Sequence, residues 1–261
     1  MSPRKVTLIT GASSGLGKDF AVEYAKAKTD LLLVARRLDR LEALKAQLEP
    51  LYGISVMVAQ VDLADPAQVD AFLNRLDPDL FIERLINNAG FGYHGAFEAY
   101  PQATLDAMVE VNIAALTRLT YHVIPMMKEN KRGEILNVAS MAAFTPGPYM
   151  AEYYTTKAYV LSLSMALHEE LKPYGIKVSA LCPGPTHTEF GQVAAYKNDS
   201  GVQRSLSMAS LPVVKMSMKA LEKNRSVAVP GSSNKLLRIL MTLVPKTMSA
   251  KILKNIQKQR F

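Results

Sequence analysis

Three residues, Tyr153, Lys157 and Ser140, have the types and spacing of a group that transfers a proton. Tyr153 and Lys157 lie four positions apart, so on a helix their side chains share one face. A free phenol has a pKa of about 10 and exchanges protons poorly at neutral pH, but a nearby ammonium favours the phenolate and lowers that pKa. Ser140 precedes the tyrosine by thirteen positions and can hydrogen-bond a carbonyl oxygen. We therefore predict that Tyr153 delivers a proton to a substrate oxygen.

The same pair also has an ordinary interpretation, because tyrosine and lysine at this spacing are common on helices. Tyr149 and Tyr154 are close in sequence, yet neither has a lysine four positions later. Ser140 and a glycine-rich segment near the N-terminus favour the chemical interpretation of the Tyr153 pair.

That segment, residues 10–17, reads Thr-Gly-Ala-Ser-Ser-Gly-Leu-Gly and lies between an apolar run and a helical pattern. Glycines there allow a tight turn, close approach of the backbone to phosphates and close packing of helix on strand. The helix N-terminus that follows offers free N–H groups to a pyrophosphate. A purely structural turn is the alternative. We predict dinucleotide contacts at Gly11, Ser13, Ser14, Gly15, Leu16 and Gly17.

Two arginines, Arg36 and Arg37, follow the next apolar run, residues 31–35. An acid at this point would hold the ribose hydroxyls of NAD(H). A guanidinium pair instead suits the 2′-phosphate of NADP(H), which it can bind through paired hydrogen bonds. We therefore predict NADP(H) as the cofactor, and a pair of solvated arginines at a helix start is the alternative.

Residues after two later strands complete the predicted cofactor site: Asp62, Leu63, Asn88, Ala89 and Gly90. The Asp62 carboxylate can accept a hydrogen bond from the adenine amino group or cap the next helix, although Asp65 is better placed for capping. Small residues and a glycine after the fourth strand permit close backbone approach to the ligand.

Short β-branched and apolar runs alternate with helical patterns along the chain. Strands are expected at 5–10, 31–35, 55–61, 134–139 and 177–181, and the end of another strand at 85–87. Helices are expected at 15–27, 38–51, 66–76, 104–128 and 153–174. This alternation predicts an α/β fold, a doubly wound sheet of parallel strands joined by right-handed crossovers. Such sheets bind ligands at the carboxyl ends of their strands, where the motifs above fall.

Length and composition favour one domain. The chain has 261 residues, 49% of them hydrophobic, and no linker, repeat or low-complexity tract. Cys182 is the single cysteine and the histidines lack partners at ligand spacing, so no metal site is expected. The sequence shows no signal-peptide layout and no stretch of about 18–20 apolar residues, so we expect a cytoplasmic location.

The net charge of +8 is concentrated at the end of the chain. Residues 231–261 hold seven Lys and Arg and no acid, which leaves 24 basic and 23 acidic residues, or +1, for residues 1–230. A nucleic-acid surface is therefore not expected. We expect residues 231–261 to form a basic amphipathic extension of the 1–230 domain. It would pack over the substrate cleft or a subunit contact, lie on an anionic membrane, or attract an acidic carrier.

The two longest predicted helices, 104–128 and 153–174, carry apolar residues on more than one stripe. Part of this surface would be exposed in a monomer, so we expect a homodimer or homotetramer. The residues concerned are Leu116, Leu119, Ala158, Leu161 and Met165.

Over nearly all of residues 1–230 these motifs resemble those of the short-chain dehydrogenase/reductase family. The resemblance implies a seven-stranded parallel Rossmann sheet, and assembly through the two long helices. The residues that match the family's catalytic positions are Asn112, Ser140, Tyr153 and Lys157. Asn112 is similar to a residue that holds a water between the lysine and solvent. The arginine pair and a Pro-Gly-x-x-Asn segment at 230–234 resemble those of a bacterial branch of the family.

The resemblance also implies cofactor contacts after the sixth strand. Pro183, Gly184 and Thr188 match the motif that contacts the nicotinamide carboxamide, and Thr186 stands where the family usually has an aliphatic residue. Beside it, the residues that flank the catalytic strand ends suggest an apolar substrate wall, with loop packing as the alternative. They include Met141, Phe144, Tyr149 and Phe190.

The expected activity is hydride transfer between NADP(H) and a carbonyl compound or secondary alcohol. Tyr153 would protonate the oxygen, Ser140 would position it, and Lys157 would lower the tyrosine pKa and hold the nicotinamide ribose. Ketones, aldehydes, steroids and 3-oxoacyl thioesters remain as substrate classes. The alternative is a non-catalytic NADP-binding regulatory or scaffold protein, which would not require all four catalytic positions.

Overall fold

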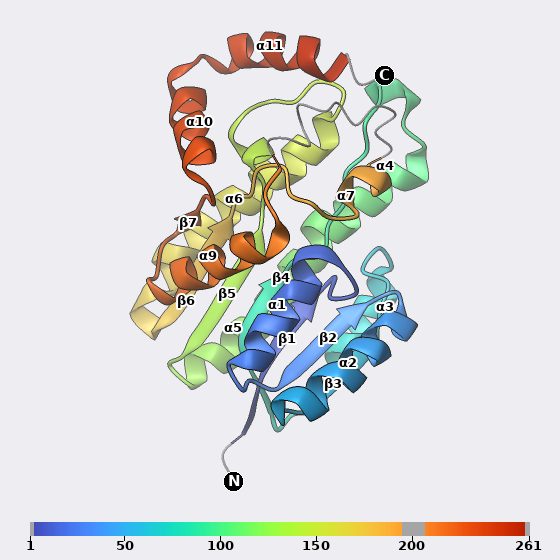
Figure 1. Cartoon of the computed structure of the whole chain (residues 1–261), viewed down its shortest axis with the longest axis vertical. Coiled ribbons are helices and arrows are strands. Elements are labelled where there is room, and N and C mark those ends of the chain that lie inside the picture. The colour runs from blue at the N-terminus through green and yellow to red at the C-terminus, as the bar shows by residue number, and fades with distance from the viewer. Residues whose placement is uncertain (1–2, 195–206, 259–261) are drawn as a thin grey trace.

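A computed structural model gives the structure of the protein and describes residues 3–194 and 207–258. Within these residues, seven parallel strands form one sheet in the order β3-β2-β1-β4-β5-β6-β7 (Figure 1). The strands are β1 Arg4–Thr10, β2 Leu31–Ala35, β3 Val56–Gln60, β4 Leu80–Asn87, β5 Gly133–Val138, β6 Ile176–Leu181 and β7 Val227–Ala228. The strand order reverses between β1 and β4, which is the switch point where doubly wound sheets bind ligands. The predicted fold class is confirmed.

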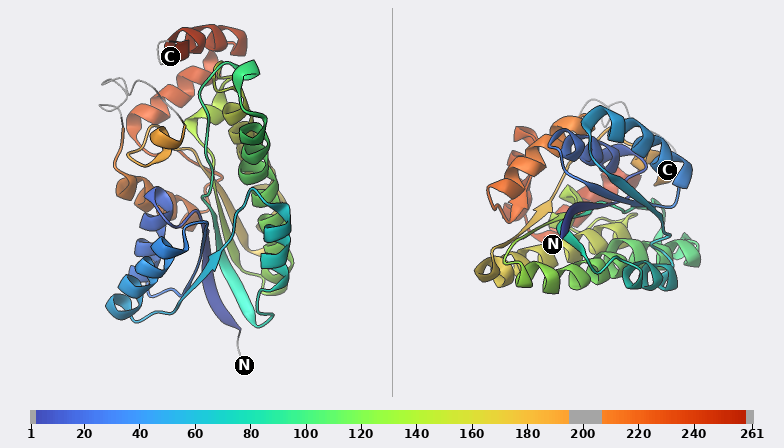
Figure 2. Two further views of the ribbon diagram at one scale, coloured as in Figure 1. Left: turned by 90° about the vertical axis from the view of Figure 1, so that its right-hand side faces the viewer. Right: turned by 90° about the horizontal axis from the view of Figure 1, so that it is seen from below.

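Helices cover both faces of the sheet (Figure 2). One face carries α1 Gly15–Lys26, α2 Leu38–Tyr52 and α9 Ser210–Glu222. The other carries α3 Pro66–Asn74, α4 Gln102–Val109, α5 Leu116–Glu129 and α6 Ala151–Leu171. Strands covered on both faces need apolar side chains in both directions, and every residue of β2 is buried for this reason.

The helix predicted at 104–128 is interrupted in its middle. A π-helical segment, η2 Glu110–Ala115, joins α4 to α5. Such segments shift the register of a helix and often occur at functional sites. Asn112 lies in this segment and is fully buried, although asparagine is usually exposed. The interruption therefore turns a polar side chain toward the interior.

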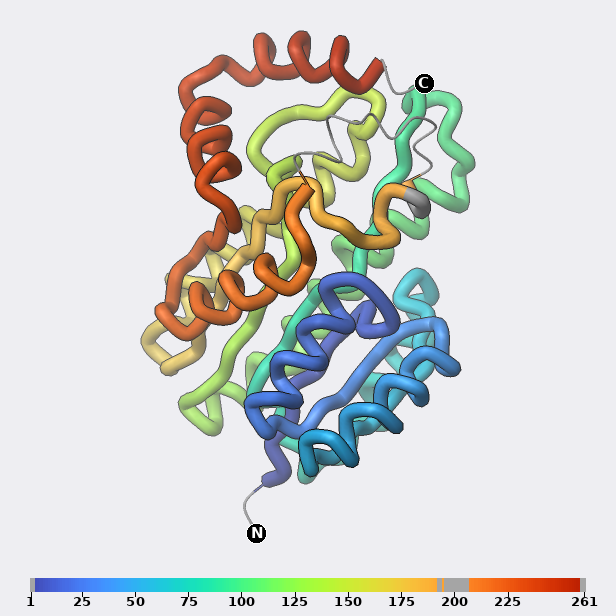
Figure 3. Tube along the Cα trace, viewed as in Figure 1, coloured from blue at the N-terminus to red at the C-terminus, as the bar shows by residue number. Residues whose placement is uncertain are grey.

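Short helical elements and two C-terminal helices complete the described structure. They are η1 Phe97–Ala99, η3 Met141–Phe144, η4 Lys172–Tyr174, α7 Phe190–Val193, α10 Ser232–Leu243 and α11 Lys246–Lys258. In Figure 3 the red α10 and α11 extend past the carboxyl ends of the strands, at the end of the molecule opposite the N-terminus. In the described ranges, no helix combines the length and the apolar character needed to cross a bilayer.

One side of α11 packs onto the domain. Thr145 donates a 2.7 Å hydrogen bond to the hydroxyl of Ser249, and the Gln257 amide donates to the Tyr154 hydroxyl at 3.3 Å. The Gln257 carbonyl oxygen lies 3.1 Å from the Nε2 of His94. Both Ser249 and Gln257 are buried. The structure thus has the tail folded against the domain, and the opposite sides of α10 and α11 are exposed.

The apolar surface predicted on the two long helices is smaller than expected. Leu116, Leu119 and Leu161 are buried. Leu119 packs from α5 onto the sheet, and Leu116 and Leu161 pack in a cluster of apolar residues near the ends of β5 and β6. The prediction of exposure is wrong for these three residues. Ala158 and Met165 are exposed as predicted.

Candidate active site

Helix α6 places Tyr153 and Lys157 one turn apart, and both side chains are buried. The Lys157 Nζ lies 5.8 Å from the centroid of the Tyr153 ring. It donates a 2.8 Å hydrogen bond to the carbonyl oxygen of Val138, the last residue of β5. Burial lowers the pKa of Lys157 to about 8. The Lys157 ammonium therefore lies beside Tyr153 in a buried environment that disfavours the charged form of the lysine.

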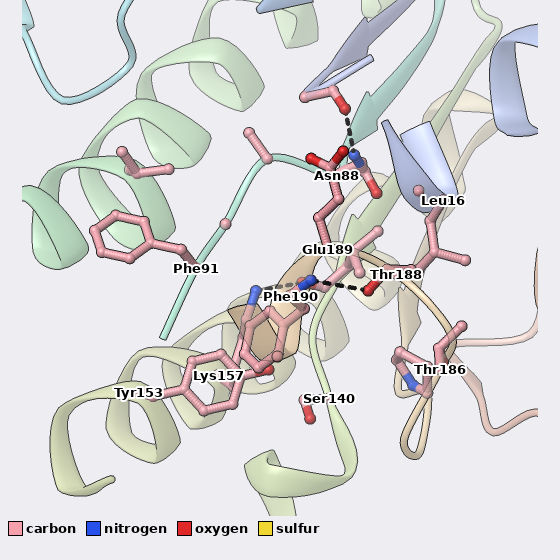
Figure 4. Close-up of a pocket in the computed structure, with 18 of the residues that line it drawn as sticks. Leu16, Asn88, Phe91, Ser140, Tyr153, Lys157, Thr186, Thr188, Glu189 and Phe190 are labelled. Carbon is pink, nitrogen blue, oxygen red and sulfur yellow. Dashed lines mark hydrogen bonds between the residues drawn. The ribbon is translucent and has the colours of Figure 1, made fainter. Parts of the chain in front are cut away.

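Ser140 follows β5 at the start of η3. Its hydroxyl oxygen accepts a 3.1 Å hydrogen bond from the backbone N–H of Ala142, which caps this short helix. The next residue, Met141, donates its N–H to the carbonyl oxygen of Pro183 at 2.9 Å, so the ends of β5 and β6 are joined here. Figure 4 shows Ser140, Tyr153 and Lys157 on the wall of one cleft.

Asn112 connects the loop after β4 to α6. Its side chain accepts a hydrogen bond from the Phe91 N–H at 3.1 Å and donates to the Phe91 carbonyl oxygen at 2.9 Å. It also donates to the Thr156 hydroxyl at 3.0 Å. A Cβ added to Gly90 would lie 3.0 Å from both the Asn112 Oδ1 and the Lys157 Nζ. The side chains of Asn112 and Lys157 therefore both pack against Gly90, where a larger residue would crowd them.

The glycine loop after β1 is shaped by close contacts. Gly11 has a φ of +64°, and a Cβ there would lie 2.9 Å from the Ala89 Cα. A Cβ on Gly17 would collide with the carbonyl oxygen of Gly11. The Asn88 amide donates to the Gly11 carbonyl oxygen at 3.2 Å, which joins the loops after β1 and β4. Gly15, also at positive φ, begins α1 beside Thr188.

A cleft of about 860 Å³ runs along the carboxyl ends of the strands. The predicted cofactor residues, except Gly17, line it: Gly11, Ser13, Ser14, Gly15, Leu16, Arg36, Arg37, Asp62, Leu63, Asn88, Ala89, Gly90, Tyr153, Lys157, Pro183, Gly184, Thr186 and Thr188. Gly17 is buried behind the loop, and Asn112 lies behind the wall. The volume is in the range of cofactor and substrate pockets.

Two of the four predicted substrate residues, Met141 and Phe190, line the cleft. Phe144 and Tyr149 are not among the lining residues. The Phe144 ring instead lies 5.2 Å from the guanidinium of Arg238 on α10. Tyr149 has a φ of +66°, and its carbonyl oxygen accepts a hydrogen bond from the Gly95 N–H.

Some lining residues were not predicted. Phe91, Val111, Met150 and Tyr154 come from the β4 loop, the π segment and the start of α6, and Leu253, Ile256 and Gln257 come from α11. The apolar stripe of α11 is visible in the sequence. Its position over the cleft depends on contacts of Gln257 with Met150 and Tyr154, which are 107 and 103 positions away in the chain.

Arg37 is the centre of a polar cluster at one end of the cleft. Its Nε and Nη2 donate to the Ser13 hydroxyl at 3.2 and 3.0 Å, and Nη2 also donates to the Ser14 hydroxyl at 2.8 Å. Its Nη1 donates to the Glu189 carboxylate at 2.9 Å, and Arg40 donates to the other carboxylate oxygen at 2.7 Å. Hydrogen bonds from these two arginines lower the pKa of Glu189 to about 2. Glu189 and Arg40 were not predicted as site residues.

These features fit a dinucleotide with a phosphorylated adenosine. The glycine loop lines the cleft at the N-terminus of α1, where free N–H groups can bind a pyrophosphate, and Arg37 with two serine hydroxyls can donate to a further phosphate. Asp62 lines the same end of the cleft, and its carboxylate accepts the Ala64 N–H at 3.0 Å. Asp65 caps α3 through the N–H groups of residues 67 and 68, as predicted.

No group of three or more His, Cys, Asp and Glu side chains is arranged to hold a metal ion within residues 3–194 and 207–258. The single cysteine, Cys182, is buried beneath the site, and its burial raises its pKa to about 12.

The chain is similar to known proteins in sequence and in fold. The family model of the short chain dehydrogenases matches residues 5–199. The very-long-chain 3-oxoacyl-CoA reductase of Coprinopsis cinerea is 36% identical over 176 residues, which cover 66% of this chain and 51% of that protein. The chain thus spans about half the length of that relative. The NADP-dependent 3-hydroxy acid dehydrogenase of Schizosaccharomyces pombe is 31% identical over 233 residues, 86% of this chain and 90% of that protein.

Among solved structures, a short-chain dehydrogenase from Sphingobium yanoikuyae in complex with NADPH is 34% identical and has a TM-score of 0.80. The superposition covers 93% of this chain and 96% of that one. The family match spans most of the strands that carry the cleft, including the Ser140, Tyr153 and Lys157 positions. The chain belongs to the short-chain dehydrogenase family of oxidoreductases.

Proposed function

We propose that the chain is an NADP(H)-dependent enzyme that transfers hydride between the nicotinamide and a carbonyl or secondary alcohol carbon. The observation that carries this proposal is that Tyr153, Lys157 and Ser140 line the same cleft as the Arg37 cluster. One end of the cleft thus has proton-transfer groups and the other has phosphate donors. The NADPH-bound relative and the NADP-dependent relative support the choice of cofactor.

In this mechanism NADPH in the cleft supplies the hydride. Ser140 donates a hydrogen bond to the substrate oxygen, and the Tyr153 hydroxyl gives that oxygen a proton. The Lys157 ammonium stabilises the phenolate that remains. Asn112 holds the β4 loop against α6, which keeps the lysine and the tyrosine in place. Gly11, Gly15 and Ser13 bind the phosphates through backbone and hydroxyl groups.

The substrate end of the cleft has apolar walls. Met141, Met150 and Phe190 come from the domain, and Leu253 and Ile256 come from α11. Such walls suit a substrate with an extended apolar arm. Two relatives are named for 3-oxoacyl-CoA and 3-hydroxy acids, so we propose 3-oxoacyl compounds as the substrate class, ahead of steroids and simple ketones.

The test is a screen of 3-oxoacyl thioesters of increasing chain length, a 3-oxo acid, a steroid ketone and a bulky aryl ketone, followed by NADPH absorbance. We expect kcat/KM to rise with the length of the acyl chain, because each methylene buried contributes about 0.8 kcal/mol, or roughly fourfold. Tight NADPH binding without turnover of any carbonyl would favour the non-catalytic alternative.

The outward side of α10 and α11 has the character of a membrane-binding surface, defined here as the outer tail face. Its exposed apolar residues are Leu236, Leu237, Ile239, Leu240, Leu243, Met248 and Ile252. Cations lie among them on the same two helices, at Lys235, Lys246, Lys251, Lys254 and Lys258. Residues 231–258 contain no acid, so two copies of this face would repel each other.

We therefore propose that residues 231–261 act as an extension of the 1–230 domain, and that the outer tail face lies on an anionic membrane surface in the cytoplasm. Three lysines near such a surface contribute about 1 kcal/mol each, so their loss should weaken binding roughly a hundredfold. The variant Lys235→Gln/Lys251→Gln/Lys254→Gln would be sedimented with anionic and neutral vesicles. Lys172→Gln/Lys219→Gln/Lys223→Gln is the control with the same change of charge. Equal vesicle binding by both variants contradicts the proposal, and binding of an acidic carrier protein alone would favour the carrier alternative.

We also propose a homodimer or homotetramer. Tyr121, Tyr159 and Met165 are exposed on the outer side of α5 and α6, with Tyr121 at 78%. Apolar groups of this size on adjacent helices favour a subunit contact. Light scattering at micromolar concentration tests it, and a monomeric mass contradicts it.

A further inference from the structure

Glu189 places an anion on the arginines that are proposed to bind a phosphate. One carboxylate oxygen accepts from Arg37 at 2.9 Å and the other from Arg40 at 2.7 Å. The Nε and Nη2 groups of Arg37 donate to the hydroxyls of Ser13 and Ser14. Glu189 is 152 positions from Arg37 in the chain and reaches it from the segment after β6. An acidic side chain has thus been brought by the fold to the cationic end of the cleft.

The next residue, Phe190, packs against Tyr153 at the other end of the cleft. Its ring centroid lies 5.2 Å from that of Tyr153. A Cβ added to Gly92 would lie 3.1 Å from the tip of the Phe190 ring and 3.0 Å from the Tyr153 ring. Figure 4 shows Glu189 and Phe190 projecting from the same segment into the cleft. Two adjacent residues therefore contact the phosphate-binding arginine and the tyrosine proposed for proton transfer.

We infer that Glu189 is a cofactor-specificity residue, an internal competitor that must be displaced from Arg37 by the 2′-phosphate of NADP(H). This inference rests on the proposed function. A phosphate monoester carries close to two negative charges and three acceptor oxygens, so it competes well with a single carboxylate for a guanidinium. The ribose hydroxyls of NAD(H) are neutral and do not. Like charges also keep Glu189 and the phosphate from sharing Arg37.

The competing explanation is that Glu189 orients Arg37 and Arg40 so that they receive the phosphate. The two explanations predict opposite signs. If Glu189 competes, its removal strengthens the binding of a 2′-phosphate. If it orients, its removal weakens that binding. The side chains of Glu189 and Arg37 are each 40% exposed, so the arginine has room to meet a ligand without the carboxylate.

The test uses the full chain and its Glu189→Gln and Glu189→Ala variants. Calorimetry would give dissociation constants for adenosine 2′,5′-bisphosphate and adenosine 5′-monophosphate, and NADPH fluorescence would give that of the whole cofactor. Glu129→Gln is the matched control, because it removes the same charge from an exposed site at the end of α5 on the far face of the sheet. Thermal unfolding of each variant would show that the fold is retained.

Exposed ion pairs are individually weak, so we expect both Glu189 variants to bind the 2′,5′-bisphosphate and NADPH about 3- to 30-fold more tightly. Binding of the 5′-monophosphate and of NADH should change less than about twofold. Unchanged or weaker binding of the bisphosphate by both variants overturns the inference. If the wild-type chain prefers NADPH and only the Glu189 result fails, the inference fails and the proposed cofactor stands. If the wild-type chain does not distinguish the two adenosine ligands, both fail.

Discussion

The Lys157 ammonium donates a 2.8 Å hydrogen bond to the carbonyl oxygen of Val138, so the end of β5 fixes the lysine of α6. Lys157 is only 4% exposed, and burial lowers its pKa to about 8. A cation buried in this way, hydrogen-bonded to a neutral carbonyl oxygen, is costly for stability. The proposed role of Lys157 beside Tyr153 accounts for this position, and a variant without the charge should show the cost in stability.

The first prediction concerns the pH dependence of stability. The pKa of Lys157 is about 8 in the folded chain and 10.5 for an ordinary lysine, so between these values the unfolded chain binds more protons. The unfolding free energy of the wild type should therefore rise with pH across this window, relative to Lys157→Met. The total change is up to about 3 kcal/mol, at about 1.4 kcal/mol for each pKa unit. Urea unfolding of both proteins at several pH values gives the difference. A difference that is constant or falls with rising pH contradicts the buried, charged lysine.

The second prediction separates the two arginines. The Arg37 guanidinium donates to the hydroxyls of Ser13 and Ser14, whereas Arg36 accepts a hydrogen bond from the Gln60 amide through its backbone carbonyl oxygen. A charge-assisted hydrogen bond contributes about 1.5–3 kcal/mol, so Arg37→Ala should raise the NADPH dissociation constant about tenfold to a hundredfold. Arg36→Ala should have a smaller effect, and NADH binding should change little in either variant. Fluorescence titration measures all four constants. Equal losses in the two variants would contradict the geometry.

The third prediction concerns Asn112. Its replacement by alanine leaves the N–H and carbonyl groups of Phe91 and the hydroxyl of Thr156 without this partner. Each buried polar group left unpaired costs about 1–3 kcal/mol, so we expect a loss of roughly 3 kcal/mol in unfolding free energy. Asn130→Ala, at an exposed helix end, is the control and should cost less than about 1 kcal/mol. Calorimetry would measure the unfolding free energy of both variants. Equal losses of stability would contradict the conclusion that Asn112 holds the β4 loop against α6.

Much of the fold could be predicted because its periodic signals are local. The β2 strand and α2 helix occupy the predicted ranges to within a residue. The π segment could not be predicted, since the sequence from 104 to 128 reads as an ordinary helix. The strand β7 spans only Val227–Ala228, which is too short to show a period, and the resemblance alone implied it.

The site divides in the same way. The Tyr153–Lys157 pair and the glycine loop are each recognised from residues close in sequence, and the alternation of strands and helices placed both motifs at the carboxyl edge of the sheet. Glu189 reaches Arg37 across 152 positions, and Gln257 reaches Tyr154 across 103. Contacts between residues so far apart in the chain cannot be predicted from a local sequence pattern. Proximity in sequence also misled, because Phe144 lies near Ser140 in the chain but packs beside Arg238.

The most direct test of the proposed mechanism compares Tyr153→Phe with Tyr154→Phe. Both variants lose one phenolic hydroxyl near the cleft, but only Tyr153 has Lys157 one turn later on its face of α6. Single-turnover reduction of the best substrate and NADPH titration would be measured on the same samples. We expect Tyr153→Phe to lose at least about a hundredfold in rate while it binds NADPH within about twofold of the wild type. Tyr154→Phe should keep most of its rate. A Tyr153→Phe enzyme that retains more than a few per cent of the wild-type rate, roughly the limit set by losing a general acid, contradicts the assignment.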